Sequence, residues 1–131
     1  MTTVKAIKLA PGNIWSGSKK LAVFTNPTEL AFRKGNLKNH YPVEFRGEVF
    51  PDCEAIYWRF KKSESDLMAF MVEFMQAKLL QYPVLMQTID LSGGIDFLNK
   101  CYHKVNGGYW ESSHKEDRFM TCLKKAYLSF K

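Results

Sequence analysis

Four side chains that could act together in binding or catalysis recur at helical spacing in the middle of the chain. They are Glu54, Tyr57, Trp58 and Lys61, at positions i, i+3, i+4 and i+7, so a helix would place them on one face. A carboxylate, two aromatic rings and an amine along such a face can stack a flat ring and place an acid or base beside it. Spacing alone favours a simpler interpretation, in which an exposed glutamate and lysine flank half-buried aromatic side chains.

A second group lies nearer the C-terminus, where a glycine turn precedes two aromatic residues. Gly107 and Gly108 would allow the backbone to approach a ligand closely, and Trp110 offers a further stacking surface. A helix start expected at Ser113, with a capping box completed by Glu116, would supply backbone amides for an anion. The alternative is that Trp110 fills the core and Ser113 only caps the helix.

The sequence contains no pattern typical of a metal or dinucleotide site. Cys101 and His103 are two residues apart, but no Cys-x-x-Cys pair or paired histidine motif accompanies them. The pair Gly93-Gly94 lacks the third glycine and the strand–turn–helix context of a dinucleotide fingerprint. We therefore expect no metal and no cofactor.

Length and composition predict one domain that spans residues 1–131. Of the 131 residues 46% are hydrophobic and 15% aromatic, which suffices for one hydrophobic core. The N-terminus lacks the pattern of a signal peptide, and no apolar run is long enough to span a membrane. Three cysteines at wide spacing argue against a disulfide framework. We expect a cytoplasmic protein without membrane association; the sequence does not indicate its oligomeric state.

A surplus of basic residues favours an anionic partner. The 19 lysines and arginines exceed the 13 acidic residues, giving a formal charge of +6. Such a charge suits phosphate, a nucleotide or nucleic acid. The lysines are spread along the chain without a recognisable nucleic-acid-binding motif, so the charge allows a nucleic-acid partner without indicating one.

The elements that would position these residues begin with short strands. Runs of β-forming residues at Val4–Leu9 and Leu21–Thr25 are separated by turn residues and suggest strands. Residues 41–45 and 48–50 flank Arg46-Gly47 and predict a hairpin. The first half of the chain is therefore expected to supply the β structure.

Helices are expected to dominate the remainder. Asp52 is a suitable N-cap and Pro83 a suitable first helical residue. Helices are expected over 53–62, from Ser63 to about Leu79 and over 84–88, while 95–103 fits a strand or a helix. A final amphipathic helix is expected after the Ser113 capping box, with an apolar stripe from Phe119 to Phe130. The helix from Ser63 is apolar on two faces and should be central. The predicted class is α+β: a small, mostly helical domain with short strands or hairpins packed against the helices.

Several segments occur in an order and at spacings that match one protein family. Phe24-Thr25-Asn26 precedes the hairpin, Glu54 and Lys61 follow seven residues apart, Lys78 lies on the next helix, Ser92-Gly93-Gly94 and Tyr109-Trp110 come later, and Asp117 lies in the closing segment. In this arrangement the chain resembles a short, divergent member of the NADAR (YbiA-like) family. Members of that family cleave N-glycosidic bonds in ADP-ribose-linked or related nucleotide compounds.

The resemblance implies a role for each matched residue. Glu54 would stabilise an oxocarbenium-like transition state or activate water. Lys61 would protonate the leaving group, hold phosphate or form a Schiff base. Substrate binding would involve Asn26, Tyr57 and Asp117, with Trp58 and Trp110 around the base and Lys78 at the diphosphate.

Two departures from the family pattern support an alternative function. The family's Trp-Gly-x-Gly loop reads Trp110-Glu111-Ser112-Ser113 here. Only Glu111 can replace an acidic residue that the family has shortly before this tryptophan, and it is expected as a third catalytic residue beside Glu54 and Lys61. The stretch between the first two helices of the family is nearly deleted. The alternative is a non-catalytic protein that binds or sequesters an ADP-ribose-type nucleotide or nucleic acid.

Overall fold

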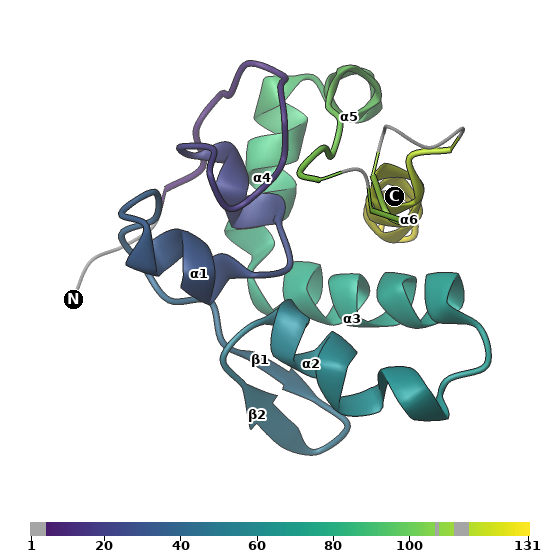
Figure 1. Cartoon of the computed structure of the whole chain (residues 1–131). Coiled ribbons are helices and arrows are strands. Elements are labelled where there is room, and N and C mark those ends of the chain that lie inside the picture. The colour runs from purple at the N-terminus through teal and green to yellow at the C-terminus, as the bar shows by residue number, and fades with distance from the viewer. Residues whose placement is uncertain (1–4, 107, 112–115) are drawn as a thin grey trace.

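The computed structural model describes residues 5–106, 108–111 and 116–131. Its elements, with η for a 3-10 helix, are η1 (Leu21–Phe24), α1 (Thr28–Arg33), β1 (Val43–Phe45), β2 (Glu48–Phe50), α2 (Cys53–Phe60), η2 (Lys61–Ser63), α3 (Leu67–Gln81), α4 (Pro83–Ser92), α5 (Ile95–Lys100) and α6 (Arg118–Leu128). Helix α3 lies between α2 with the hairpin on one side and α4, α5 and α6 on the other (Figure 1). This is the small, mostly helical α+β domain that the sequence predicts.

The predicted hairpin is present, and its turn has the expected chemistry. Strands β1 and β2 pair antiparallel, with Val43 opposite Phe50. Between them Arg46 and Gly47 have φ angles of 51° and 83°, the two positive values that a type I′ turn requires. The alternation along β1 buries Val43 and Phe45, and this strand packs on α3.

Aspartate caps mark the start of α2 and α3. The carboxylates of Asp52 and Asp66 each accept a backbone N–H bond of 3.0 Å from the first turn of the following helix, which satisfies donors that a helix start leaves open. The cap at Asp52 was predicted. Two bounds differ from the prediction: α2 ends at Phe60, where the chain tightens into η2, and α3 begins after Asp66, not at Ser63.

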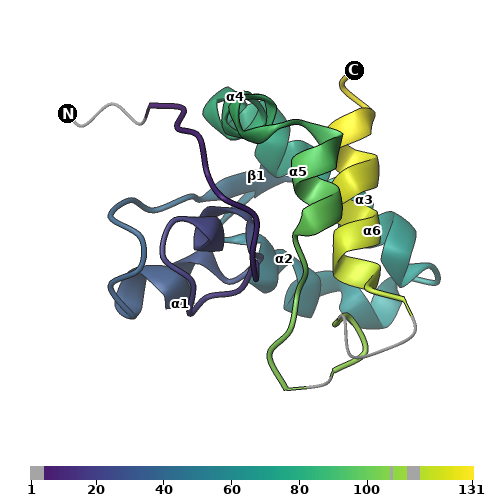
Figure 2. The same cartoon turned by 90° about the horizontal axis from the view of Figure 1, so that it is seen from above.

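Helix α3 is the core helix, as its two apolar faces predict. Its buried apolar side chains are Phe70, Met71, Phe74, Met75 and Leu79. Helix α6 packs along it with a buried apolar stripe (Phe119, Met120, Leu123, Ala126 and Tyr127), and α5 lies beside α6 (Figure 2). Burying an apolar side chain of this size contributes about 1.5–3 kcal/mol, so the α3–α6 contact is a main source of stability.

The N-terminal region differs from the prediction. Leu21–Thr25, expected as a strand, contains the 3-10 helix η1, and residues 5–9 form no regular element. Two backbone N–H groups of the N-terminal segment donate instead to Thr88 Oγ1 and Ser92 Oγ of α4, at 3.3 and 2.9 Å. Hydroxyl acceptors on a helix thus replace the neighbouring strand that these residues would otherwise need.

The structure also decides the elements that the sequence left open near the C-terminus. Residues 95–100 are helical, and α4 continues beyond the predicted range to Ser92. The predicted start of the last helix at the Ser113 capping box is wrong. Ser113 lies outside the described residues, but Glu116 precedes the helix, and α6 begins after Asp117, whose carboxylate accepts the Met120 N–H at 3.1 Å. Across the described parts of the chain, no helix has the length and apolar character needed to cross a membrane.

Candidate functional site

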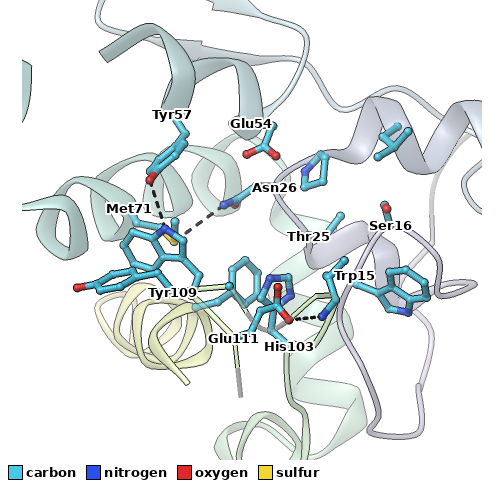
Figure 3. A pocket seen from close by; sticks show the side chains of 16 residues that line it. Trp15, Ser16, Thr25, Asn26, Glu54, Tyr57, Met71, His103, Tyr109 and Glu111 are labelled. Carbon is cyan, nitrogen blue, oxygen red and sulfur yellow. Dashed lines mark hydrogen bonds between the residues drawn. The ribbon is translucent and has the colours of Figure 1, made fainter. Parts of the chain in front are cut away.

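A cavity of about 310 Å³ opens between the N-terminal region, α2 and the segment that leads into α6 (Figure 3). We call it the site cavity. Its volume is at the lower end of the range of about 300–1000 Å³ that small-molecule sites occupy. Five of the site residues predicted from sequence line it: Asn26, Glu54, Tyr57, Trp110 and Glu111.

Glu54 lies in the first turn of α2, with its carboxylate directed into the site cavity (Figure 3). Asp52 fixes this position, because its second carboxylate oxygen accepts the Glu29 N–H at 3.0 Å and so links the starts of α1 and α2. The Glu54 N–H donates to the Asn26 carbonyl at 3.3 Å. Within the described residues, the Glu54 side chain has no hydrogen-bond or ion-pair partner.

The environment of Glu54 favours its neutral form. Burial raises the pKa of the Glu54 carboxyl above its ordinary value, and the negative charge of Asp52 raises it further. A carboxyl that is half-buried and has no cation to offset its charge holds its proton to a higher pH than a surface glutamate. Enzymes use such environments to prepare a carboxyl group for acid–base chemistry.

Lys78 supports the wall of the site cavity and does not line it. Its buried Nζ donates to the carbonyl oxygens of Val23 and Thr25, at 2.6 and 2.8 Å, and burial lowers the pKa of Lys78. These bonds fix the segment that presents Thr25 and Asn26 to the cavity. The Asn26 amide also reaches Met71 Sδ at 3.9 Å. The Lys78 ammonium, which the resemblance places at a diphosphate, is therefore directed to two carbonyl groups and not into the site cavity.

Tyr57 and Trp110 form an aromatic wall at one end of the site cavity. Trp110 Nε1 donates to the Tyr57 hydroxyl at 3.3 Å, and the two rings meet edge to face with centroids 6.1 Å apart. Tyr109 packs edge to face on Trp110 at 5.1 Å, and the Arg118 guanidinium lies 3.8 Å from the Tyr109 ring centroid. The tryptophan-bearing segment thus lies against α2 and borders the same hollow as Glu54.

Glu111 belongs to the cavity wall, but its carboxylate is engaged by the backbone. It accepts the N–H groups of Val105 and Asn106, the latter at 3.0 Å, and its own N–H donates to the Gly108 carbonyl at 3.0 Å. Gly108 lines the cavity, whereas Gly107 lies outside the described residues. Glu111 therefore shapes the turn that precedes α6.

His103 is a titratable residue of the site cavity that the sequence did not predict as a catalytic residue. Its Nδ1 donates to the Ile14 carbonyl at 2.7 Å, because a carbonyl oxygen only accepts, and Nε2 is the other ring nitrogen. Its ring stacks on Phe119 with centroids 4.5 Å apart. A parallel bridge between Asn13 and Tyr102 joins the segment of Ile14 to that of His103. Ile14 and His103 are 89 residues apart in the sequence, so no local spacing could reveal their contact.

Lys61 and Trp58 lie outside the site cavity, contrary to the expectation that Lys61 and Glu54 face one hollow. Trp58 is 65% exposed, and Lys61 Nζ lies 4.6 Å from its ring centroid and 5.2 Å from that of Tyr57. Seven helical residues advance about 10 Å along the axis, and Tyr57 lies between the two charged residues. Helical spacing correctly placed Glu54 and Lys61 on one side of the helix, but it did not show that they lie too far apart along the axis to share one cavity.

Asp117 has a structural position instead of a substrate-binding one. One carboxylate oxygen accepts the Met120 N–H and caps α6, and the other accepts the His103 N–H at 2.9 Å. It does not line the cavity. Asp117 therefore acts on the site only by holding the backbone of His103.

The lining of the site cavity carries acidic groups and no strong cation. Among the described residues, no lysine or arginine lines it, and no cluster of His, Cys, Asp and Glu is suited to a metal ion. Lys34 is near the rim: its Nζ donates to Ser16 Oγ at 2.7 Å and lies 5.1 Å from the Trp15 ring centroid. Both of these partners line the cavity.

Comparison with known proteins does not assign this arrangement to a family. No protein-family model, no curated protein and no solved structure matches the chain. The arguments about function therefore begin from the residues of the site cavity.

Proposed function

We propose that the protein is a hydrolase that cleaves the N-glycosidic bond of an ADP-ribosylated nucleobase or a related nucleotide compound. The observation that carries the proposal is Glu54, a half-buried carboxyl group without a partner among the described residues, directed into a cavity of about 310 Å³ with an aromatic wall. The order of sequence segments that resembles the NADAR family suggests the class of bond.

Glu54 in its ionised form suits the charge that develops in this reaction. Breaking a ribosyl–nitrogen bond gives an oxocarbenium-like sugar with positive charge at C1 and the ring oxygen. No lysine or arginine in the described lining neutralises the carboxylate, so the oxocarbenium ion adds a close positive charge as it forms. Its stabilising effect is then larger in the transition state than in the bound substrate, which is the condition for catalysis. Glu54 then accepts a proton from the water that attacks C1.

His103 supplies the proton that the leaving nitrogen needs. The electrons of the broken bond move to the base nitrogen. In a substrate whose base would otherwise leave as an anion, protonation from His103 Nε2 makes the base neutral, whereas nicotinamide leaves as a neutral base without a proton. The Nδ1–H bond to the Ile14 carbonyl at 2.7 Å fixes the ring and directs the exchangeable proton to Nε2. This assigns to His103 the acid role that the family resemblance implied for Lys61, which does not line the cavity.

The remaining lining residues suit recognition of a base and a ribose. The base stacks on Trp110, which Tyr57 holds by a hydrogen bond, and the Asn26 amide faces the sugar. A diphosphate extends past Ser16 towards Lys34, whose Nζ already donates to the Ser16 hydroxyl. Lys34 thus takes the role that was expected of Lys78.

The direct test is an assay for release of the base. Purified protein is incubated with an ADP-ribosylated nucleobase, NAD⁺ or nicotinamide riboside, and products are identified by liquid chromatography and mass spectrometry. We expect the free base and the corresponding ribose compound from at least one of these. Glu54→Gln should retain ligand binding without releasing the base, whereas Glu44→Gln, an exposed position on β1, should match the unmodified protein. Equal rates for both variants would overturn the role of Glu54.

A second candidate is non-catalytic binding of the same compounds. One observation favours it: Lys61, the amine that the resemblance implies for catalysis, lies outside the site cavity. Binding without any change in ligand mass would support this candidate over the hydrolase. A nucleic-acid partner would instead give an affinity that falls steeply with salt and little preference for free ADP-ribose.

A further inference from the structure

A second cavity, also of about 310 Å³, lies between the N-terminal segment, the stretch after α1 and helix α4. The N-terminal segment runs along α4 (Figure 1). The floor of the cavity is apolar and buried, formed by Leu9, Val23, Leu37, Tyr41 and Leu85. We call it the lysine cavity, after the residues of its rim. The hypothesis of an N-glycosidase does not use it.

Three lysines, Lys5, Lys20 and Lys38, line this cavity, and no acidic residue lines it among the described parts of the chain. None of the three ammonium groups has a hydrogen-bond or ion-pair partner within those residues. Three of the 19 basic residues of the chain therefore line one cavity without an acidic residue in its described lining. The three positive charges repel one another. An anion bound at this rim would offset that repulsion and be attracted by all three lysines.

The backbone at Lys20 is strained. Its φ is 64° and its ψ is −55°, and the Leu21 N–H donates across it to the Lys19 carbonyl at 2.7 Å. These values define the rare γ-turn with positive φ, which is unfavourable for a residue with a side chain. Such strain concentrates at ligand sites, where surrounding structure maintains it. Here the turn brings a lysine to the rim of an apolar cavity.

The polar groups inside the lysine cavity already have partners. The Asn36 amide donates to the Ser16 carbonyl at 2.9 Å, and Thr88 Oγ1 accepts the Ile7 N–H at 3.3 Å. The interior therefore offers a ligand mainly hydrophobic contact, while the rim offers positive charge. This division excludes a bare inorganic anion, which would leave the floor uncovered, and a neutral hydrocarbon, which would leave the rim unpaired.

We propose that the lysine cavity binds a small amphipathic carboxylate, such as a free medium-chain fatty acid. Its apolar body would cover the buried floor, and its carboxylate would meet the lysines of the rim. The cavity volume, near the lower limit for small-molecule sites, suits one short chain.

Calorimetric titration with decanoate tests the proposal. Decanoate should bind, whereas acetate, which has the head alone, and decanol, which has the body alone, should bind at least about tenfold more weakly. Replacing the three rim lysines by glutamine should weaken decanoate binding by about tenfold or more. The matched control replaces Lys62, Lys100 and Lys104, which are exposed and do not line the cavity, and should bind decanoate like the unmodified protein.

A second variant keeps the charge and removes the space. Val84 lines the cavity and is partly buried, so Val84→Phe should block decanoate while circular dichroism shows the helices intact. Equal loss of binding in the control triple variant, decanol binding as tightly as decanoate, or binding only to vesicles of anionic phospholipid would each overturn the proposal. Base release by the site cavity is measured separately, so failure of one proposal does not imply failure of the other.

Discussion

The site cavity and the lysine cavity have the same volume of about 310 Å³ and opposite charge. In the described lining, the first has Glu54 and Glu111 and no lysine or arginine, whereas the second has three lysines and no acidic residue. The net charge of +6 for the whole chain does not describe the charge of either cavity. A surplus counted over a whole chain therefore says little about a particular site: here the cavity proposed for a cationic transition state is the acidic one.

The two cavities share a wall. Val23 lines the lysine cavity and Thr25 lines the site cavity, and the ammonium of Lys78 binds both of their carbonyl groups. The Asn36 amide, in the lysine cavity, likewise binds the Ser16 carbonyl, in the site cavity. Some substitutions should consequently affect one cavity alone, and others should affect both.

The largest effect is expected from His103→Asn, which should act on the site cavity alone. The asparagine amide can replace Nδ1–H at the Ile14 carbonyl, but it has no group in the place of Nε2. We expect kcat for base release to fall by about 10²–10⁴-fold, the usual contribution of a general acid, with a smaller change in KM. Decanoate binding should be unchanged. An unaltered kcat would remove His103 from the mechanism.

Lys78→Met should damage both cavities at once. It leaves the carbonyl groups of Val23 and Thr25 without their donor, and unsatisfied buried groups of this kind cost about 1–3 kcal/mol each. We expect the free energy of unfolding to fall by about 2–6 kcal/mol in denaturant titrations, with weaker binding of both ligands. Lys62→Met, at an exposed position, is the control. Loss of only one binding activity would contradict the shared wall.

Local patterns in the sequence were sufficient for much of the fold. The β-forming runs that flank Arg46-Gly47 predicted the hairpin, and Asp52 predicted the start of α2, because each depends on neighbouring residues alone. Residues 21–25 were predicted wrongly as a strand, since their conformation depends on Lys78, far along the chain. Propensity cannot anticipate a buried amine that binds two carbonyl groups.

The candidate site was predictable only where one helix supplied it. Spacing along α2 placed Glu54 and Tyr57 together, and both line the site cavity. The same spacing misplaced Lys61, because it gives direction around a helix but not depth or the point where the helix ends. His103 required a contact between segments 89 residues apart, which a single sequence does not reveal.

The pH dependence of base release should distinguish Glu54 from an ordinary carboxyl. The reaction requires the ionised form, so the rate should fall as the pH is lowered through the pKa of Glu54. Because burial and the charge of Asp52 both raise this pKa, the midpoint should lie above the value of about 4.3 for a free glutamate. Asp52→Asn removes the charge and keeps one acceptor oxygen for the Ala55 N–H, but it loses the bond to the Glu29 N–H. It should move the midpoint to lower pH and also lower the free energy of unfolding. A midpoint that does not move would exclude the influence of Asp52.

The smallest effect expected is a gain of stability in Glu54→Gln. A carboxyl whose pKa is raised by folding binds more protons in the folded state than in the unfolded state, so its contribution to stability decreases as the pH rises through that pKa. At about pH 7 the glutamine variant should therefore be the more stable protein, by less than about 1 kcal/mol because solvent reaches the half-buried group. At about pH 3 both side chains are neutral and the difference should vanish.

Thermal unfolding at the two pH values measures this difference, with Glu44→Gln as the exposed control that should show none. If Glu54→Gln were instead less stable at neutral pH, the Glu54 carboxylate would have a stabilising partner. Its negative charge would then already be neutralised before a cationic transition state forms. Glu111 gives the contrast within the same cavity: its carboxylate accepts two backbone N–H groups, so its replacement by glutamine should destabilise the fold. Within one cavity, Glu111 is thus expected to stabilise the structure and Glu54 to lower its stability, which is the difference that the proposed role of Glu54 predicts.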